Sequence, residues 1–250
     1  YSSLLSFSQE SNCFEKCNRA HWNNTIARTN YYQYPSMDKY DVKYIKLDIN
    51  SESNSRVISG TCLTSVTTTA TLDSFITELK TNMTVDSVFL NGVKKNFSVG
   101  SDHVFIPVSP ALPSGQSLSV LIYYKGTAGS LGVYAGTTGG GPGSTPLSYT
   151  ATLSESYQAR EWFPCKQILT DKMDSAEIWV TTSSVNKVGS NGLLQGVDNL
   201  PSGKVRYRWK STHPMNYYML SIAVGNYSEY LNYAHPTSIA PDSILIQHYI

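Results

Sequence analysis

The chain has 250 residues, of which 40% are hydrophobic and 15% charged, and its 19 Lys and Arg residues nearly balance 18 Asp and Glu residues. The resulting formal net charge of +1 argues against a nucleic-acid-binding or membrane-surface protein, both of which need a basic footprint. No run approaches the roughly 20 apolar residues of a membrane-spanning helix, and residues 1–7 lack the basic region of a signal peptide. We therefore expect the chain as given to be soluble.

The composition favours strands over helices. Charged residues fall well below the usual quarter of a chain, whereas Tyr is abundant at 18 residues and Ser, Thr, Val and Asn are plentiful. The least strand-like segment is residues 1–40, where Ser6 to Gln9 fits a capping box and an apolar stripe begins at Phe14. We predict a short helix and an irregular lead-in over residues 1–40, followed by a β domain over residues 41–250.

Alternating apolar and polar residues predict strands from Asp41 onward. Ile45, Leu47 and Ile49 alternate with polar neighbours, a polar turn follows at residues 50–55, and the alternation then resumes, which is typical of a hairpin with long arms. The same period of two recurs in further segments, at residues 74–79, 85–90, 103–107, 117–124, 175–182 and 205–210. We expect these segments to form an antiparallel sheet.

The second half of the chain begins with a glycine-rich segment. Residues 126–146 are rich in Gly, Ser and Thr, which favours a flexible loop, and no Gly-Lys-Ser/Thr follows the glycines to make a phosphate-binding loop. Beyond it, Val205, Tyr207 and Trp209 share one face of a strand, and residues 218–224 predict a buried central strand. Because strand patterns lie on both sides of the predicted loop, we expect one continuous β domain.

The cysteines and histidines form no metal or nucleophile motif. The four cysteines include no CxxC pair, and Cys13 and Cys17 lie one helical turn apart, which leaves a disulfide and two free thiols equally open. The five histidines include no His-Glu-x-x-His pair, and the sequence has no Gly-x-Ser-x-Gly elbow. These patterns alone indicate a β-rich domain without a catalytic motif.

One stretch carries a family resemblance. From Thr150 to Ser175 the chain reads TATLSESYQAREWFPCKQILTDKMDS, and a strand pattern follows. This stretch resembles a segment of the zinc aminopeptidases of the aminopeptidase N type, the gluzincins, in which a Gln or Glu at a strand end leads through an Arg and a Pro-Cys pair to an Asp-rich turn. Further landmarks agree in order, namely Val88–Gly92, Leu112–Gly126 and Tyr218–Gly225. The resemblance spans about residues 40–230 and implies the N-terminal domain of such an enzyme, an all-β fold with a large, twisted, saddle-like antiparallel β-sheet that is β-sandwich-like.

The catalytic apparatus of that family does not occur in this sequence, which contains neither Gly-x-Met-Glu-Asn nor His-Glu-x-x-His. The resemblance therefore implies a zinc metallo-aminopeptidase whose zinc ligands and catalytic residues lie outside this chain, in a downstream catalytic domain of the same polypeptide. We expect the chain alone to hold no cofactor and to be inactive. A fragment and a stand-alone homologue without the catalytic domain both remain open.

Within the resemblance, Glu155 aligns with the family position that anchors the substrate amine, and Ser156 lies next to it. An exopeptidase must recognise the free ammonium group of its peptide, and an ion pair with a carboxylate fixes the scissile bond one residue away. The alternative is an ordinary carboxylate in a surface turn. The resemblance gives Arg160, Pro164 and nearby residues structural roles, and we expect Arg160 to pair with Asp171 or Asp174.

The implied partners are the N-terminus of a peptide substrate and the downstream domain, with no nucleic acid and no membrane span. A second hypothesis is a non-catalytic carbohydrate- or protein-binding module, because exposed rings among 18 Tyr, 4 Trp and 7 Phe residues could form a binding platform. A purely structural or docking role is the third. Secreted or cell-envelope location is favoured over the cytoplasm.

Overall fold

The structure is a computed structural model that describes residues 33–139, 145–239 and 241–250. The chain divides into two units, Tyr1–Tyr34 and Pro35–Ile250. The predicted N-terminal helix and the question of a bond between Cys13 and Cys17 lie outside the described residues. The boundary predicted after residue 40 stays a prediction.

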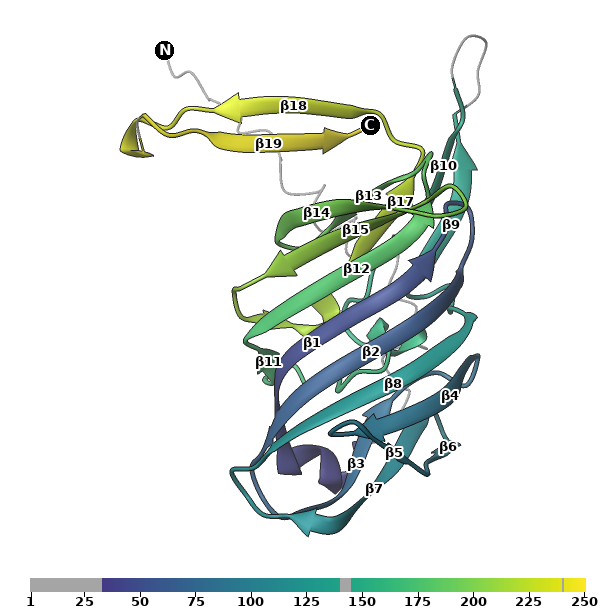
Figure 1. The fold of residues 1–250 in the computed structure, drawn as a ribbon, viewed down its shortest axis with the longest axis vertical. Coiled ribbons are helices and arrows are strands. Elements are labelled where there is room, and N and C mark those ends of the chain that lie inside the picture. The colour runs from purple at the N-terminus through teal and green to yellow at the C-terminus, as the bar shows by residue number, and fades with distance from the viewer. Residues whose placement is uncertain (1–32, 140–144, 240) are drawn as a thin grey trace, which may run out of the picture. The chain divides into compact units, whose positions relative to one another are not determined.

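The described part of Pro35–Ile250 is nearly all β, as predicted (Figure 1). Its helical elements are short 3₁₀ turns, η2 (Pro35–Lys39), η3 (Ala159–Glu161), η4 (Tyr217–Met219) and η5 (Thr237–Ile239). The strands of the first half are β1 (Tyr40–Ser51), β2 (Val57–Thr68), β3 (Leu72–Glu78), β4 (Met83–Leu90), β5 (Val93–Lys95), β6 (Ser98–Gly100), β7 (His103–Leu112), β8 (Ser117–Thr127) and β9 (Val133–Thr138). Those of the second half are β10 (Leu147–Thr152), β11 (Lys172–Met173), β12 (Ser175–Ser183), β13 (Lys187–Ser190), β14 (Leu193–Leu200), β15 (Lys204–Ser211), β16 (Met215–Asn216), β17 (Ile222–Gly225), β18 (Glu229–Ala234) and β19 (Ile244–Tyr249). Within these described ranges, no helix has the length and apolarity needed to cross a bilayer.

The largest sheet has eight strands in the order β14-β15-β12-β1-β2-β8-β4-β5 (Figure 1). Adjacent strands in this sheet are antiparallel, as predicted, except for β1 and β12. These two strands run parallel, with Leu47 opposite Ile178. A parallel pair needs a long crossover connection, and the chain between β1 and β12 builds most of the remaining strands. One sheet therefore joins segments from both halves of the sequence.

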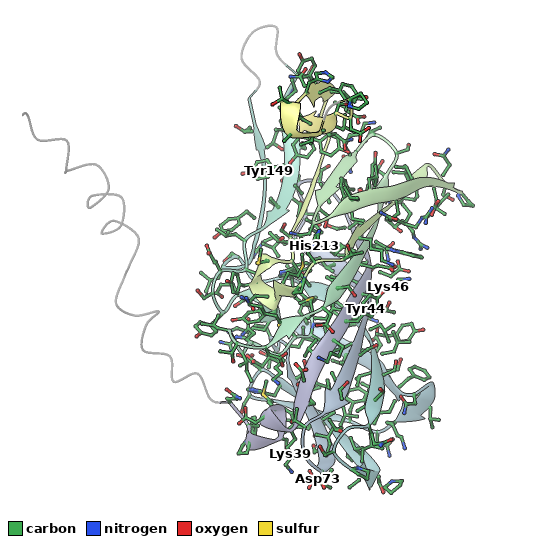
Figure 2. The ribbon with its side chains drawn as sticks, turned by 90° about the vertical axis from the view of Figure 1, so that its left-hand side faces the viewer. Lys39, Tyr44, Lys46, Asp73, Tyr149 and His213 are labelled. Atoms are coloured by element: carbon green, nitrogen blue, oxygen red, sulfur yellow. The ribbon has the colours of Figure 1, made fainter. Side chains whose placement is uncertain are left out.

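The alternation seen in the sequence sets the two faces of this sheet. Ile45, Leu47 and Ile49 are at most 2% exposed, and Tyr207 and Trp209 lie on the same buried side, as predicted. The opposite face carries charged residues, and Figure 2 labels Tyr44 and Lys46 on it. There the Nζ atom of Lys46 lies 3.2 Å from the ring centroid of Trp179, a cation–π contact. Other charges on this face are paired, as in Arg208–Asp198, Arg206–Asp48 and Lys210–Glu177.

A second layer covers the buried face. It includes the three-stranded sheet β3-β7-β6, from which Phe75 stacks on Tyr40 of β1 at 4.7 Å between ring centroids. It also includes the four-stranded sheet β13-β17-β10-β9. In that sheet, the fully buried Thr150 hydroxyl lies within hydrogen-bond distance of the Glu52 and Ser55 carbonyl oxygens in the β1–β2 turn, at 2.8 and 3.0 Å. These contacts give the unit its sandwich-like layering.

Two local predictions differ from the structure. The segment predicted as a loop, residues 126–146, contains β9, because Val133 is fully buried and the strand pairs along β10. The strand predicted over residues 218–224 is shorter, since Tyr217–Met219 forms η4 and only Ile222–Gly225 is β17. β17 is nevertheless an inner strand, between β13 and β10, as the apolar run indicates.

Two glycines that flank β14, Gly192 before it and Gly203 in the turn to β15, allow a test of this packing. Gly192 has φ +85°, and a Cβ atom there would lie 2.0 Å from the carbonyl oxygen of Lys210, whereas Gly203 has φ +67° with nothing within 4 Å of a Cβ. Gly203→Ala carries only the left-handed backbone penalty, about 1 kcal/mol. Gly192→Ala adds a backbone clash and should lower the free energy of unfolding by about 2–4 kcal/mol, measured by urea denaturation. Equal losses in the two variants would contradict the hairpin register.

Candidate functional site

The turn between β10 and η3 holds the residues that the sequence singled out. Leu153 N donates to the Gly132 carbonyl at 3.0 Å, and Gln158 N donates to the Ser154 carbonyl at 3.0 Å, which closes the turn. The indole Nε1 of Trp162 donates to Ser154 Oγ at 2.9 Å, and both side chains are buried. The peptide bond between Glu155 and Ser156 is cis. The hydrogen bonds of Leu153, Ser154 and Gln158 hold the backbone on both sides of Glu155.

Ser156 is held through its backbone. Its carbonyl oxygen accepts a hydrogen bond from the hydroxyl of Tyr217, a residue of η4 that is 2% exposed. Burial raises the pKa of Tyr217 well above its ordinary value, so the hydroxyl keeps its proton and remains a donor. The Ser156 side chain itself is exposed. Ser156 thus links the turn to η4, a contact between segments 61 residues apart in the chain.

Glu155 is exposed at this turn. Its carboxylate makes no hydrogen bond and no ion pair with any of the described residues. A carboxylate without an internal partner on a fixed backbone is available to bind a cation from outside. The structure therefore brings Glu155 and Ser156 together on one anchored turn, with only Glu155 offering a charge.

The segment after the turn is held by a buried carboxylate. Glu78, at the end of β3, is 0% exposed and accepts hydrogen bonds from the backbone N and side-chain Nε2 of Gln167 at 3.2 and 2.9 Å. Arg160 Nη1 lies 3.6 Å from the same carboxylate. The expectation that Arg160 pairs with Asp171 or Asp174 is wrong, because Asp171 pairs with Lys166 and Asp174 with Lys43. The pattern of charges in the sequence contains no signal for the partner in β3, which lies about eighty residues upstream.

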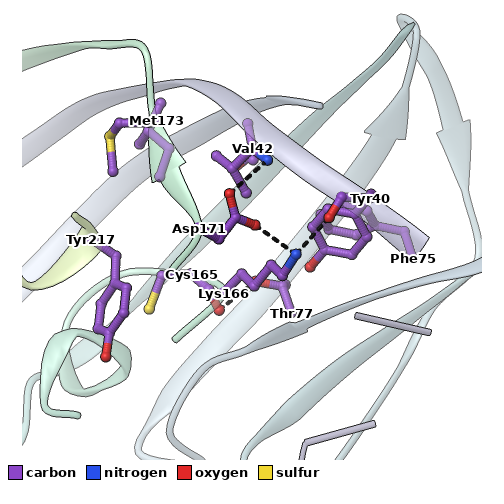
Figure 3. A pocket seen from close by; sticks show the side chains of 11 residues that line it. Tyr40, Val42, Phe75, Thr77, Cys165, Lys166, Asp171, Met173 and Tyr217 are labelled. Carbon is purple, nitrogen blue, oxygen red and sulfur yellow. Dashed lines mark hydrogen bonds and ion pairs between the residues drawn. The ribbon is translucent and has the colours of Figure 1, made fainter. Parts of the chain in front are cut away.

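A second buried ion pair lies beside a small cavity (Figure 3). Lys166 Nζ is 2.6 Å from Asp171 and also donates to the Tyr40 carbonyl, while Asp171 accepts from Val42 N at 3.1 Å. Burial raises the pKa of Asp171, although the nearby Lys166 opposes this shift. The cavity has a volume of about 10 Å³, room for no more than about one water molecule. This cluster joins the two layers and is too closed to be a substrate site.

The described residues contain no group of three His, Cys, Asp or Glu side chains placed to hold a metal ion. Cys62 and Cys165 are buried free thiols, and burial raises the pKa of Cys62 to about 12. A thiol with such a pKa is not a nucleophile near neutral pH. At the turn itself, Glu155 offers an exposed carboxylate, a group suited to binding a cation.

Sequence reasoning missed the residues that hold the turn. Trp162 belongs to the stretch that carries the resemblance, but its bond to Ser154 has no separate signal in the sequence. Tyr217 of η4 and Glu78 of β3 are far from this segment in the sequence, and nothing in their local patterns marks them.

Solved structures of M1 zinc metallopeptidases share this fold. The crystal structure of an M1 zinc metallopeptidase from Deinococcus radiodurans superposes with a TM-score of 0.70 at 17% identity, covering 84% of this chain and 47% of that chain. A mutant of the Deinococcus radiodurans enzyme bound to a Tyr-Ser-Ala substrate gives 0.69 at 16% identity, and a two-domain M1 mutant bound to L-arginine gives 0.68 at 18%, with the same coverage. No protein-family model and no curated protein sequence matches the chain.

At these identities the likeness shows the fold. The chain has the fold of part of an M1 zinc metallopeptidase and spans about half the length of the solved structures it matches. The fold that the sequence resemblance implied is thereby confirmed.

The hydroxyl of Tyr217 provides a test of how the turn is held. Tyr217→Phe removes the donor to the Ser156 carbonyl and should lower the free energy of unfolding by about 1 kcal/mol, measured by urea denaturation. Tyr123→Phe is the matched control, because Tyr123 is 41% exposed, and it should change stability by less than about 0.5 kcal/mol. A Tyr217→Phe chain as stable as the control would show that the turn does not depend on this bond.

Proposed function

We propose that this chain is the N-terminal substrate-cleft domain of a zinc-dependent aminopeptidase and that Glu155 binds the free amine of the peptide substrate. The observation that carries the proposal is the exposed Glu155 carboxylate, which has no partner among the described residues on a turn fixed by Trp162 and Tyr217. The fold supports it, since structures with this fold hold a Tyr-Ser-Ala substrate, L-arginine and L-tryptophan.

The proposed role of Glu155 is recognition and positioning. An ammonium group and a carboxylate form short charge-assisted hydrogen bonds, which strengthen when a second domain excludes water around them. Holding the amine at a fixed point sets the distance from the peptide N-terminus to the first peptide bond, so the bond to be cleaved is presented in register. Ser156 contributes through its backbone, because its carbonyl is tied to Tyr217.

The described residues do not fit a zinc site. The sequence has no His-Glu-x-x-His motif, and the described residues contain no cluster of three ligand side chains. In the proposed enzyme, zinc belongs to a downstream catalytic half of the polypeptide, where it would activate water. The part played by the present chain is limited to binding and orienting the peptide.

The alternative of a binding module with an aromatic platform has less support. Tyr207 and Trp209 are 5% and 8% exposed and belong to the core. The ring of Trp179 on the outer face is covered by Lys46 at 3.2 Å. These rings are therefore not available as a stacking surface for a sugar.

The proposed separation of peptide binding in this chain from catalysis in a downstream half predicts how the isolated chain behaves. Residues 1–250 should bind no zinc stoichiometrically and should not hydrolyse an aminoacyl chromogenic substrate, because the ligand helix and the general base are missing. Metal analysis after dialysis and a long-incubation activity assay measure this. One equivalent of retained zinc, or turnover that a chelator removes, would contradict the proposal.

The role of Glu155 is tested in the polypeptide that includes the catalytic half. Glu155→Ala should weaken recognition of peptides with a free amine by about 2–5 kcal/mol, or roughly 30- to 4,000-fold in kcat/KM, the usual cost of leaving one charge of a buried pair alone. Competitive inhibition by N-acetylated peptides should change little, because acetylation already removes the charge that Glu155 would bind.

The matched control is Asp73→Ala, which removes a carboxylate that is 67% exposed near η2 (Figure 2). Asp73→Ala should change neither kcat/KM for peptides with a free amine nor inhibition by N-acetylated peptides. If Glu155→Ala weakens both classes of peptide equally, Glu155 supports the structure and does not bind the amine.

A further inference from the structure

The outer face of the eight-stranded sheet changes in character across its width. Over β14, β15 and β12 it carries paired charges, such as Arg208 with Asp198. Over β2, β8 and β4, which follow β1 in the sheet (Figure 1), apolar residues and hydroxyls replace most of the charges. The only charged residues of these three strands are Lys125 and Asp86, which pair with each other at 3.0 Å.

The pairing register aligns a row of apolar residues across this part of the face. Leu63 of β2 is opposite Leu121 of β8, and Leu121 is opposite Phe89 of β4. Their neighbours along the strands, such as Cys62 and Val120, are fully buried, so these three side chains point outward. Each of the three is half-buried. Three apolar side chains therefore lie next to one another on the outer face.

A lysine lies at each end of this row. Lys46 of β1 is opposite Leu63, and Lys94 of β5 is opposite Phe89, so both lie on the same face as the apolar residues. Because adjacent strands are about 4.8 Å apart, four steps separate the two lysine backbones by roughly 19 Å. Neither lysine forms an ion pair with a described residue, and Lys46 lies over the Trp179 ring. We call these five residues the outer row: Lys46, Leu63, Leu121, Phe89 and Lys94.

The carboxylates near Lys46 are engaged elsewhere. Glu177, opposite Lys46 on β12, pairs with Lys210 at 3.3 Å. Asp48, the next outward residue of β1, lies 3.6 Å from Arg206. The ammonium group of Lys46 is therefore available to attract an anion from outside.

Hydroxyl groups flank the outer row on both sides. Two residues further along the strands, Tyr123 of β8 lies between Thr61 and Ser87, its partners on β2 and β4. On the other side of the row, Ser65 is opposite Ser119. The hydroxyls of these five residues form no hydrogen bond with the described residues. The apolar centre is thus bordered by hydroxyls that can both donate and accept.

Tyr123 and Phe89 form an aromatic pair that faces water. Their ring centroids are 5.7 Å apart with an angle of 62° between the ring planes, and Tyr123 is 41% exposed. They differ in this respect from Tyr207 and Trp209, which belong to the core. An aromatic ring with polar groups beside it suits a sugar, whose C–H face is apolar and whose edge carries hydroxyls.

We propose that the outer row and its flanking hydroxyls bind an acidic polysaccharide, a chain of sugars that carry carboxylates. The sugar rings lie on Phe89, Leu121 and Tyr123, and their hydroxyls bond to the flanking Ser and Thr side chains. The carboxylates bind the ammonium groups of Lys46 and Lys94. A neutral sugar would leave both ammonium groups without an anion, and a polyphosphate would leave the apolar centre unused.

This second ligand goes beyond the proposed recognition of a peptide. The outer row lies on one face of the eight-stranded sheet, whereas the second layer, in which β10 leads to the Glu155 turn, covers the other face. A polysaccharide on the outer row leaves Glu155 accessible. Binding there would hold the protein on an acidic glycan without occupying the candidate site.

Calorimetric titration of the chain with a galacturonate hexamer tests the inference, with cellohexaose as a neutral probe of equal length. The galacturonate hexamer should bind at least about tenfold more tightly at low salt, because the neutral sugar cannot form ion pairs with the two lysines. Its affinity should fall as salt is added, since exposed charges are screened.

Two pairs of variants locate the site. Lys94→Gln should weaken binding of the galacturonate hexamer at least about fivefold, whereas Lys172→Gln, at an exposed lysine of β11, should not change it. Tyr123→Ala should also weaken binding at least about fivefold, whereas Tyr134→Ala, which removes a ring that is 46% exposed on β9, should not. Circular dichroism verifies the fold of each variant. If Tyr123→Ala does not fold, the two lysine variants decide the outcome.

Other results overturn the inference. Equal affinity for cellohexaose means that the ligand is not an acidic sugar. Equal binding of inorganic polyphosphate, with no effect of Tyr123→Ala, means that the face attracts any anion. Equal binding of an N-acetylated glutamate hexapeptide means that the partner is an acidic polypeptide, and no binding of the galacturonate hexamer rejects the site. These results do not depend on the proposed function, because the titration needs no catalytic half.

Discussion

The arrangement of the candidate site depends on one buried carboxylate. Glu78 is 0% exposed, and leaving such a charge without partners would be costly, so the segment after the turn must supply donors. Gln167 and Arg160 do so, and the backbones of Glu78 and Cys165 exchange hydrogen bonds at 2.9 and 3.0 Å. This junction fixes the chain that carries Trp162. Trp162 in turn holds Ser154, one residue before Glu155.

The site therefore consists of one exposed carboxylate, that of Glu155, on a backbone that buried hydrogen bonds hold in place. The supporting contacts come from β3, from η4 and from the residues after the turn, whereas Glu155 itself makes no hydrogen bond or ion pair with the described residues. Such a division is suited to recognition, because a rigid support lowers the entropy lost when a ligand is fixed. It also means that substitutions at Glu155 should test binding with little effect on stability, whereas substitutions at Tyr217 test the support.

The surfaces of the unit add a second constraint. A β layer can be stable with one polar face in water, and the eight-stranded sheet follows this rule through its ion pairs and the Lys46–Trp179 contact. The four-stranded sheet carries less charge, since Lys187, which pairs with Glu229, is the single charged residue of its strands.

The sequence by itself determined the local character of this protein. Alternation along β1 and β15 predicted which residues are buried, because the two faces of a strand differ in polarity whatever their partners are. The resemblance between Thr150 and Ser175 added the fold and singled out Glu155, which the structure places on an exposed turn while its role remains a proposal. Only the tertiary structure decided the parallel pairing of β1 with β12, the strand β9 within a glycine-rich segment, and the partners of Arg160 and Ser156. These contacts join residues far apart in the chain, and no local pattern records which distant segment will supply the partner.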